Sequence, residues 1–248
     1  MSSKILLELF AGTRSISKAF EKHGWTTYSV EWDKKFENIT LYADISELTA
    51  DQVIYICGGR PTVIWASPDC TTYSVAGIGH HRKMVLGKIT PISEYAKFCD
   101  RTNKHLLELI EELKPQYFFI ENPMGALRKM PFMLDFEKRG LMKRYTVTYC
   151  QYGDFRQKPT DIWTNYPEPG FKKPCKHGDK CHESAPRHSQ SGTQKLRNKK
   201  DRATIPPLLC DYIATICNQQ PIVKQRAITD YFRAAVLDKN LGGNVEKT

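Results

Sequence analysis

The first thirty residues constrain the fold most, because two short apolar runs flank a tight turn and a helix-like segment. Residues 4–10 are almost continuously apolar, which is typical of a strand buried on both faces of a parallel sheet. A glycine-containing turn follows, then an expected helix at 15–23 and a second expected strand at 26–31. This alternation predicts an α/β architecture, a mostly parallel sheet with helices on both faces.

The same alternation continues towards residue 217. Apolar side chains at 102–113 follow helical spacing and stop at a Lys-Pro pair, whereas the other apolar runs are short enough for strands. Further strands are expected at 63–66, 117–120 and 145–150, and further helices at 102–113 and 206–217. The predicted divisions are a core at 1–165, a small irregular insertion at 166–202, a closing helix of the core within 203–220, and an extended tail at 221–248.

The composition favours one intracellular α/β unit. Hydrophobic residues make up 40% of the 248 residues, enough for a substantial core. No run of roughly 18 apolar residues occurs, so no membrane-spanning segment is expected, and the N-terminus does not resemble a signal peptide. The eight cysteines are scattered along the chain, which favours reduced thiols. We expect the protein to be monomeric.

The net charge of +10 is concentrated in one segment. Residues 156–202 hold twelve Lys or Arg against five Asp or Glu, in a stretch rich in Gly, Pro and Ser. A basic surface loop is an electrostatic footprint for a phosphate backbone. A merely solvated loop is the commoner explanation of an isolated charge run, so the choice depends on the motifs below.

A nucleoside site is expected where the first two strands end. Glu31 follows Gly12 by 19 residues, which suits hydrogen bonds to ribose hydroxyls, and Trp32 offers a face for a purine or, equally, a packing surface. The glycine pattern of a dinucleotide site is missing, which favours a ligand without a pyrophosphate, such as S-adenosylmethionine. The candidate cofactor-binding residues are Phe10, Ala11, Gly12, Thr13, Glu31, Trp32, Asp44, Ile45 and Pro68.

A candidate nucleophile, Cys70, follows the strand expected at 63–66. A lone cysteine in a long chain is usually a small buried hydrophobe. Here Pro68 stiffens the approach and the polar run at 71–74 keeps the loop out of the core, while Gly77 and Gly79 are expected to let the following loop move. Glu121-Asn122-Pro123 ends another strand at the same edge, which places a carboxylate near the thiol.

Taken in order, these motifs resemble those of the DNA cytosine-C5 methyltransferase family over roughly residues 4 to 217. The matching segments are Phe10-Ala11-Gly12, Glu31, Asp44-Ile45, Pro68-Asp69-Cys70 with Ser74, Lys114-Pro115 with Glu121-Asn122-Pro123, and Ile205-Pro206-Pro207-Leu208. The resemblance implies a Rossmann-like, S-adenosylmethionine-dependent methyltransferase fold. It also implies that Cys70 attacks C6 of a cytosine flipped out of double-stranded DNA, while Glu121 holds the base and C5 takes the methyl group.

The resemblance also implies roles for individual residues. The catalytic residues would be Cys70, Glu121 and Asn122, and the DNA-binding residues Ser74, Arg82, Lys83, Arg156 and Lys158. We expect the loop to lower the pKa of Cys70, because a thiol with a pKa of about 8.5 is only slightly ionised at neutral pH.

Three departures from the family pattern matter. Asp69 replaces a proline beside the nucleophile, and its charge disfavours a thiolate. The family's Gln-x-Arg-x-Arg element is replaced by residues 156–161, so either Lys158 or Arg156 is expected to contact the base carbonyl. The recognition region is only about forty residues, which predicts short or relaxed sequence specificity, as in compact phage and viral members.

The insertion is also a candidate zinc site. Soft and imidazole ligands this dense could bind zinc and fold a loop that has no core of its own, although their spacing matches no standard finger. A loop of free Cys and His residues is the alternative. The candidate ligands are Cys175, His177, Cys181 and His182, with His188 nearby.

The tail contains a segment, residues 225–232, that resembles the box binding the replication sliding clamp, PCNA. The side chains of Ile228, Tyr231 and Phe232 share one face of a single helical turn and would enter a hydrophobic pocket, and Gln225 supplies an amide. The alternative is an amphipathic helix that packs on its own domain. A clamp partner would place the protein in a eukaryotic, archaeal or large-virus replication setting.

Two other functions stay open at this point. An RNA (tRNA) cytosine-C5 methyltransferase would use the same nucleophile, and a catalytically impaired, clamp-tethered DNA-binding protein would explain Asp69 and the missing arginines. The expected location is the nucleus or a viral replication site for a eukaryotic or viral protein, and the cytoplasm for an archaeal or phage protein.

Overall fold

The computed structural model describes residues 4–176, 178–183, 196 and 199–220. Seven strands form one sheet in the order β3-β2-β1-β4-β7-β9-β8, and only β9 runs against its neighbours. The strands are β1 (Ile5–Leu9), β2 (Thr26–Glu31), β3 (Leu41–Tyr42), β4 (Val63–Ala66), β7 (Tyr117–Pro123), β8 (Lys143–Thr148) and β9 (Pro159–Thr164). The predicted mostly parallel α/β sheet is confirmed.

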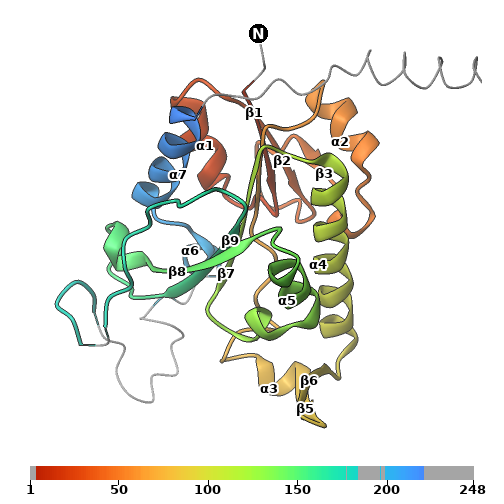
Figure 1. The fold of residues 1–248 in the computed structure, drawn as a ribbon, viewed down its shortest axis with the longest axis vertical. Helices are drawn as coiled ribbons and strands as arrows, with labels where there is room; N and C mark the ends of the chain where they lie inside the picture. Colours follow the sequence, from red (N-terminus) through yellow and green to blue (C-terminus); the bar gives the residue numbers. More distant parts are fainter. Residues whose placement is uncertain (1–3, 177, 184–195, 197–198, 221–248) are drawn as a thin grey trace, which may run out of the picture.

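Helices cover both faces of the sheet (Figure 1). Leu6 of β1 packs with the helices of one face, and its neighbours Leu7 and Leu9 pack with those of the other, because successive side chains of a strand alternate. The first face carries α1 (Ser15–Lys22) and α7 (Pro207–Gln219), which lie side by side. The second carries α2 (Ala50–Cys57), α4 (Glu94–Leu113) and α5 (Pro131–Lys138).

Several expected boundaries change. The helix expected at 102–113 begins at Glu94, because the Ser93 side chain caps it by accepting a hydrogen bond from the Ala96 amide. The strand expected at 145–150 is shifted to β8, and the strand expected at 117–120 continues to Pro123. Elements not expected from the sequence include β3, β9, α2, α5 and a separate antiparallel hairpin of β5 (Arg82–Val85) and β6 (Lys88–Pro91).

Short helical turns complete the connections. They are η1 (Ile45–Glu47), α3 (Ile78–His81), η2 (Ala126–Lys129), η3 (Tyr149–Tyr152) and α6 (Lys199–Ala203). Among the described residues, no helix combines the length and hydropathy needed to cross a bilayer.

The topology brings the candidate residues to one edge of the sheet. The carboxyl ends of β1, β2, β4 and β7 face the same way, and the antiparallel β9 begins there, with Thr160 paired to Pro123. Loops that follow β4 and β1 carry the predicted nucleophile and the predicted cofactor turn, and the carboxylate partner Glu121 lies near the end of β7 itself.

Candidate active site

The loop that carries Cys70 is fixed at both ends by hydrogen bonds to its backbone carbonyl groups. The Asn122 side-chain amide on β7 donates to the Pro68 carbonyl at 2.8 Å, and the Ala126 amide donates to the Tyr73 carbonyl at 2.8 Å. Within the loop, the Tyr73 amide donates to the Cys70 carbonyl at 3.0 Å. Asn122 is fully buried and its side-chain amide positions the loop, and the catalytic role expected for it stays a prediction.

A buried polar network ties this loop to α4. The Asp100 carboxylate accepts hydrogen bonds from the Tyr73 hydroxyl at 2.7 Å and from the Arg82 guanidinium at 2.8 and 3.1 Å. Arg82 also donates to the Thr72 carbonyl and stacks over the Tyr73 ring. Because Arg82 is 3% exposed and fully engaged, the prediction that it binds DNA is wrong. Its charge is used inside the protein.

Two glycines allow close packing around the loop. A Cβ atom on Gly77 would lie 2.2 Å from the Thr71 carbonyl oxygen, and one on Gly125 would lie 2.5 Å from the Tyr73 carbonyl oxygen. Gly77 therefore packs against the loop that carries Cys70, and the expected mobility of the residues that follow stays a prediction. Gly79 has open space around it.

Cys70 is half-buried, and its surroundings disfavour the thiolate. Burial raises the pKa of the Cys70 thiol to about 11, the negative charges of Asp69 and Glu121 add to the increase, and Lys158 opposes it. The prediction that the loop lowers this pKa is wrong for the free protein, because desolvation outweighs the nearby cation. The charge of Asp69 raises the pKa of Cys70, as the sequence predicts.

Glu121 lies at the end of β7 and is 5% exposed. Burial raises the pKa of its carboxyl group, against the lowering effects of Lys158 and of hydrogen bonds from Tyr149 and Ser67. The Tyr149 hydroxyl donates to Glu121 Oε1 at 2.9 Å. A buried carboxyl group with a raised pKa can stay protonated and donate a hydrogen bond.

Lys158 is the cation that faces this pair. Its charge acts on the pKa values of both Cys70 and Glu121, and its Nζ lies 4.5 Å from the centre of the Tyr149 ring. The ammonium group also donates to the Arg202 carbonyl at 3.0 Å, and burial lowers its own pKa. Its backbone has a φ of 29°, a strained conformation that is typical of functional positions.

Arg156 has a different role from the one expected. It is 4% exposed, its guanidinium pairs with the Asp154 carboxylate, and it donates to three backbone carbonyl groups within residues 201–204. The prediction that Arg156 binds DNA is therefore wrong, because all of these donors hold the chain near α6. Of the two cations proposed for the base carbonyl, Lys158 is the one that lies beside Cys70 and Glu121.

The predicted cofactor turn places Glu31 against Gly12. The buried Glu31 carboxylate accepts hydrogen bonds from the amides of Gly12 at 2.9 Å, Trp32 at 3.0 Å and Asp33 at 3.1 Å. Gly12 has a φ of 48°, and the atom nearest to an added Cβ is 3.8 Å away, on Phe36. Trp32 is 67% exposed, so its ring is available for stacking rather than packed in the core.

The other residues predicted for this site differ in accessibility. Ile45 is 2% exposed and packs in the core, so the prediction that its side chain forms an apolar wall for a ligand is wrong. Asp44 is exposed and caps η1 by accepting a hydrogen bond from the Ser46 amide at 2.8 Å. Of the remaining four residues, Phe10 and Thr13 are half-buried, and Ala11 and Pro68 are buried.

The other predicted DNA-binding residues lie near the same edge. The Ser74 hydroxyl accepts a hydrogen bond from the Gly77 amide at 3.2 Å, which shapes the turn after the nucleophile. Lys83 is exposed on the β5–β6 hairpin, whose tip includes Leu86 with 97% of its surface exposed. DNA contact by Ser74 and Lys83 stays a prediction.

The predicted metal ligands are brought together in part. Cys175, Cys181 and His182 lie close to one another and to Cys150, the last residue of the strand expected at 145–150. His177 and His188 lie outside the described residues, as do the clamp-binding residues Gln225, Ile228, Tyr231 and Phe232.

Sequence reasoning missed Tyr149 and Glu8. Tyr149 follows β8 and supports both Glu121 and Lys158, but a single tyrosine in an apolar run gives no signal of that role. Glu8 is the one acid inside the first apolar run, and it accepts hydrogen bonds from the Ser17 amide at 2.8 Å and from Ile16 at 3.3 Å. Burial raises the pKa of Glu8 to about 7, although hydrogen bonds from Ser17 oppose the shift.

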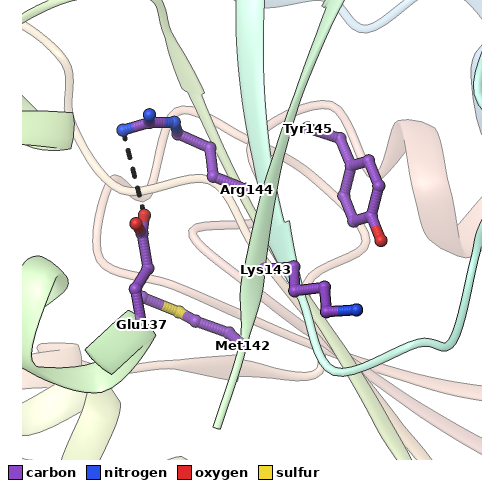
Figure 2. Close-up of a pocket in the computed structure, with 5 residues that line it drawn as sticks. All are labelled: Glu137, Met142, Lys143, Arg144 and Tyr145. Atoms are coloured by element: carbon purple, nitrogen blue, oxygen red, sulfur yellow. Dashed lines mark ion pairs between the residues drawn. The ribbon is translucent and has the colours of Figure 1, made fainter. Parts of the chain in front are cut away.

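A shallow hollow lies at the opposite edge of the sheet. Glu137, Met142 and the first residues of β8 line it, and Figure 2 shows Arg144 reaching towards Glu137, with which it pairs at 3.8 Å. Lys143, at the start of β8, pairs with Thr164 at the end of β9, whereas the start of β9 meets the end of β7 near Cys70. This hollow is therefore separate from the candidate active site.

The sheet order, with an antiparallel β9 beside β7, is that of a Rossmann-like fold of the S-adenosylmethionine-dependent methyltransferase type. No protein-family model matches the chain. In sequence it is similar to a protein of Frog virus 3 (isolate Goorha) named as a probable DNA (cytosine-5)-methyltransferase, with 26% identity over 183 residues, covering 71% of this chain and 77% of the viral protein.

Two solved structures overlap with parts of the chain. A protein described as a DNA modification methyltransferase of an E. coli prophage has a TM-score of 0.49 and 17% identity, covering 65% of this chain and 46% of that protein. The S. pombe Dnmt2 methyltransferase has a TM-score of 0.47 and 13% identity, covering 66% of this chain and 51% of that protein. The aligned part of this chain thus spans about half the length of these two proteins.

Proposed function

We propose that this protein transfers a methyl group from S-adenosylmethionine to C5 of cytosine in DNA, through a covalent adduct between Cys70 and C6. The observation that carries the proposal is the convergence of Cys70, Glu121 and Lys158 at the carboxyl edge of the sheet, beside the turn that holds Glu31. The homology to the viral protein named as a probable DNA (cytosine-5)-methyltransferase supports the same conclusion.

The chemistry follows from a nucleophile beside a proton donor and a cation. The target cytosine leaves the duplex stack, because C5 and C6 are otherwise shielded by neighbouring bases. The Cys70 sulfur forms a bond to C6, and the displaced electron pair makes C5 nucleophilic. C5 accepts the methyl group as the bond between that methyl and the cofactor sulfur breaks, and then loses its proton to a base. The C6–S bond breaks, which restores the aromatic ring and returns the thiolate.

Glu121 and Lys158 stabilise the charge that this attack creates. A protonated Glu121 donates a hydrogen bond to N3 of the base, and the raised pKa of its carboxyl group favours that state. Lys158 faces the base carbonyl and offsets the developing negative charge. Because the pKa of Cys70 is high in the free protein, we propose that the thiol loses its proton only once DNA is bound.

The residues around Gly12 fit the cofactor. A carboxylate has about four acceptor positions, and three backbone amides occupy three on Glu31, which leaves one for a ribose hydroxyl. The exposed Trp32 ring can stack on an adenine, and the free oxygen of the Asp44 carboxylate can accept from its amino group. When bound, S-adenosylmethionine supplies an electrophilic methyl group.

Double-stranded DNA is the proposed substrate, and the basic insertion at 166–202 its recognition element. The phosphate backbone of DNA would attract the excess positive charge of the insertion. The test measures tritiated-methyl transfer from labelled S-adenosylmethionine to duplex DNA and, in parallel, to transfer RNA. We expect label in DNA only, and none when every cytosine is already 5-methylcytosine. Label confined to RNA would overturn the DNA assignment.

We also propose recruitment to replicating DNA by a sliding clamp, supported by the sequence of residues 225–232 alone. The proposal predicts that the full chain binds PCNA in solution, measured by calorimetry. A double change, Tyr231→Ala with Phe232→Ala, removes two of the three apolar anchors and should weaken binding by about a hundredfold or more. Lys239→Ala, outside the box, is the matched control. Equal affinity for all three proteins would contradict clamp recruitment.

A further inference from the structure

We infer that Cys150, Cys175, Cys181 and His182 form a structural zinc site that fastens the insertion to the wall of the active site. Their four candidate ligand atoms all lie within 4.8 Å of one another. The Sγ atoms of Cys150 and Cys175 are 3.2 Å apart, those of Cys150 and Cys181 are 3.6 Å apart, and His182 Nδ1 is 3.6 Å from both Cys175 Sγ and Cys181 Sγ.

These separations suit tetrahedral zinc. With Zn–S bonds of about 2.3 Å and Zn–N bonds of about 2.0 Å, tetrahedral ligand atoms lie about 3.5–3.8 Å apart. Three of the four separations fall in that range, and the fourth, 3.2 Å between the Sγ atoms of Cys150 and Cys175, is shorter. A disulfide is a poorer explanation, because an S–S bond is about 2.05 Å long and all eight cysteines are free.

The surroundings support thiolate ligands. The side-chain amide of Gln157 approaches Cys175 Sγ at 3.5 Å, and that of Gln151 approaches Cys181 Sγ at 3.6 Å. The Cys175 amide also donates to the Thr148 hydroxyl at 3.1 Å, which fixes the backbone of this ligand. Amide donors directed at sulfur are the outer contacts that orient metal ligands and stabilise their charge.

The site connects two segments that are far apart in the sequence. Cys150 belongs to η3, whereas the other three ligands lie in an irregular stretch with exposed neighbours and no regular secondary structure among its described residues. Such a stretch buries too little apolar surface to order itself, so a metal can supply the missing stabilisation. Four protein ligands leave no open position, which makes the role structural rather than catalytic.

The zinc site would also stabilise residues of the candidate active site. Cys150 directly follows Tyr149, which donates to Glu121, and Gln157 directly precedes Lys158. Zinc would therefore hold the segment 149–158 in place and attach the basic insertion beside it. This inference is independent of the reaction itself, because it concerns metal binding by the folded chain.

The test is the metal content of the full chain, measured by elemental analysis after purification without chelator. We expect about one zinc per chain, and visible absorption typical of tetrahedral thiolate coordination when cobalt replaces zinc. Cys181→Ser and His182→Ala should lose the metal. Cys57→Ala, a change at a buried cysteine outside the cluster, is the matched control and should keep it.

A second variant keeps the test decisive if the first two fold poorly. His182→Cys preserves four ligands, so it should retain zinc and add thiolate-to-cobalt absorption. Wild-type protein that stays metal-free after incubation with zinc would overturn the inference. So would full zinc occupancy in His182→Ala, or a Cys150–Cys175 disulfide found by alkylation and mass spectrometry in the native protein.

Discussion

The nucleophile loop at 68–82 and the described start of the insertion, residues 166–176 and 178–183, are held in opposite ways. The loop is part of the core, because buried side chains such as Asn122 and Asp100 bond to it from β7 and α4. The insertion is mostly exposed, and Cys175 and Cys181 of its described part contact Cys150 of η3 through their sulfur atoms. The nucleophile loop should therefore unfold only with the whole domain, whereas the insertion should open locally.

The largest expected effect comes from Glu121, whose charge acts on Cys70 and which accepts a hydrogen bond from Tyr149 of η3. Glu121→Gln keeps the size of the side chain but removes the proton that the mechanism assigns to it. Methyl transfer to DNA should fall by about 10²- to 10⁴-fold, the usual contribution of a positioned proton donor. Steady-state kinetics measures the loss, with Tyr149→Phe as a milder comparison that removes one hydrogen bond to Glu121. Wild-type activity in Glu121→Gln would remove the carboxyl group from the mechanism.

The claim that the nucleophile loop belongs to the core predicts the next effect. Arg82→Met leaves the buried Asp100 carboxylate without its cation, which should cost about 3–5 kcal/mol of unfolding free energy. Lys83→Met changes the exposed neighbouring cation and should cost less than about 0.5 kcal/mol. Chemical denaturation measures both variants. Equal stability of the two would mean that the buried network does not anchor the loop.

The contrast between the regions also explains what the sequence could predict. Residues 4–10 predict their strand because burial on both faces demands a continuous apolar run. Cys70 and Glu121 were placed at one edge because parallel strands end there. Arg82 was misassigned because an arginine in a polar loop looks exposed until its partner, Asp100, is known to lie 18 positions away on a packed helix.

The rest of the site could not be predicted, because it depends on contacts between residues that are far apart in the sequence. Cys150 reads as part of an apolar strand, and only the fold brings it to the cysteines of the insertion. The choice between Lys158 and Arg156 likewise depended on Asp154 and the backbone near α6, which engage Arg156. The pKa of Cys70 required its burial, a quantity that the local sequence does not contain.

Removal of the metal should affect the two regions differently. Chelation should accelerate amide hydrogen exchange by roughly tenfold or more in 149–158 and 171–183, because a local opening would no longer break metal bonds. The nucleophile loop should exchange at nearly its original rate. Exchange measured by mass spectrometry before and after chelation provides the comparison. Equal acceleration in both regions would show that they unfold together.

The smallest expected effect concerns Asp69. Its charge helps to raise the pKa of Cys70, so Asp69→Asn should lower that pKa and increase the thiolate fraction at neutral pH. The alkylation rate of Cys70 in the free protein should rise about three- to tenfold, a shift of about half to one pKa unit. In the wild type, the rate should keep increasing as the pH rises towards about 11. An unchanged rate in Asp69→Asn would contradict this electrostatic account.

The most direct measurement is covalent trapping on duplex DNA that contains 5-fluorocytosine. Fluorine at C5 cannot leave as a proton does, so the bond between the Cys70 sulfur and C6 persists once the methyl group is transferred. With S-adenosylmethionine present, wild-type protein should form a denaturation-resistant adduct whose linked peptide contains Cys70. Cys70→Ser, shown to be folded by its thermal unfolding, should form none. No adduct from the wild type, or an adduct that persists in Cys70→Ser, would contradict the assignment of Cys70 as the nucleophile.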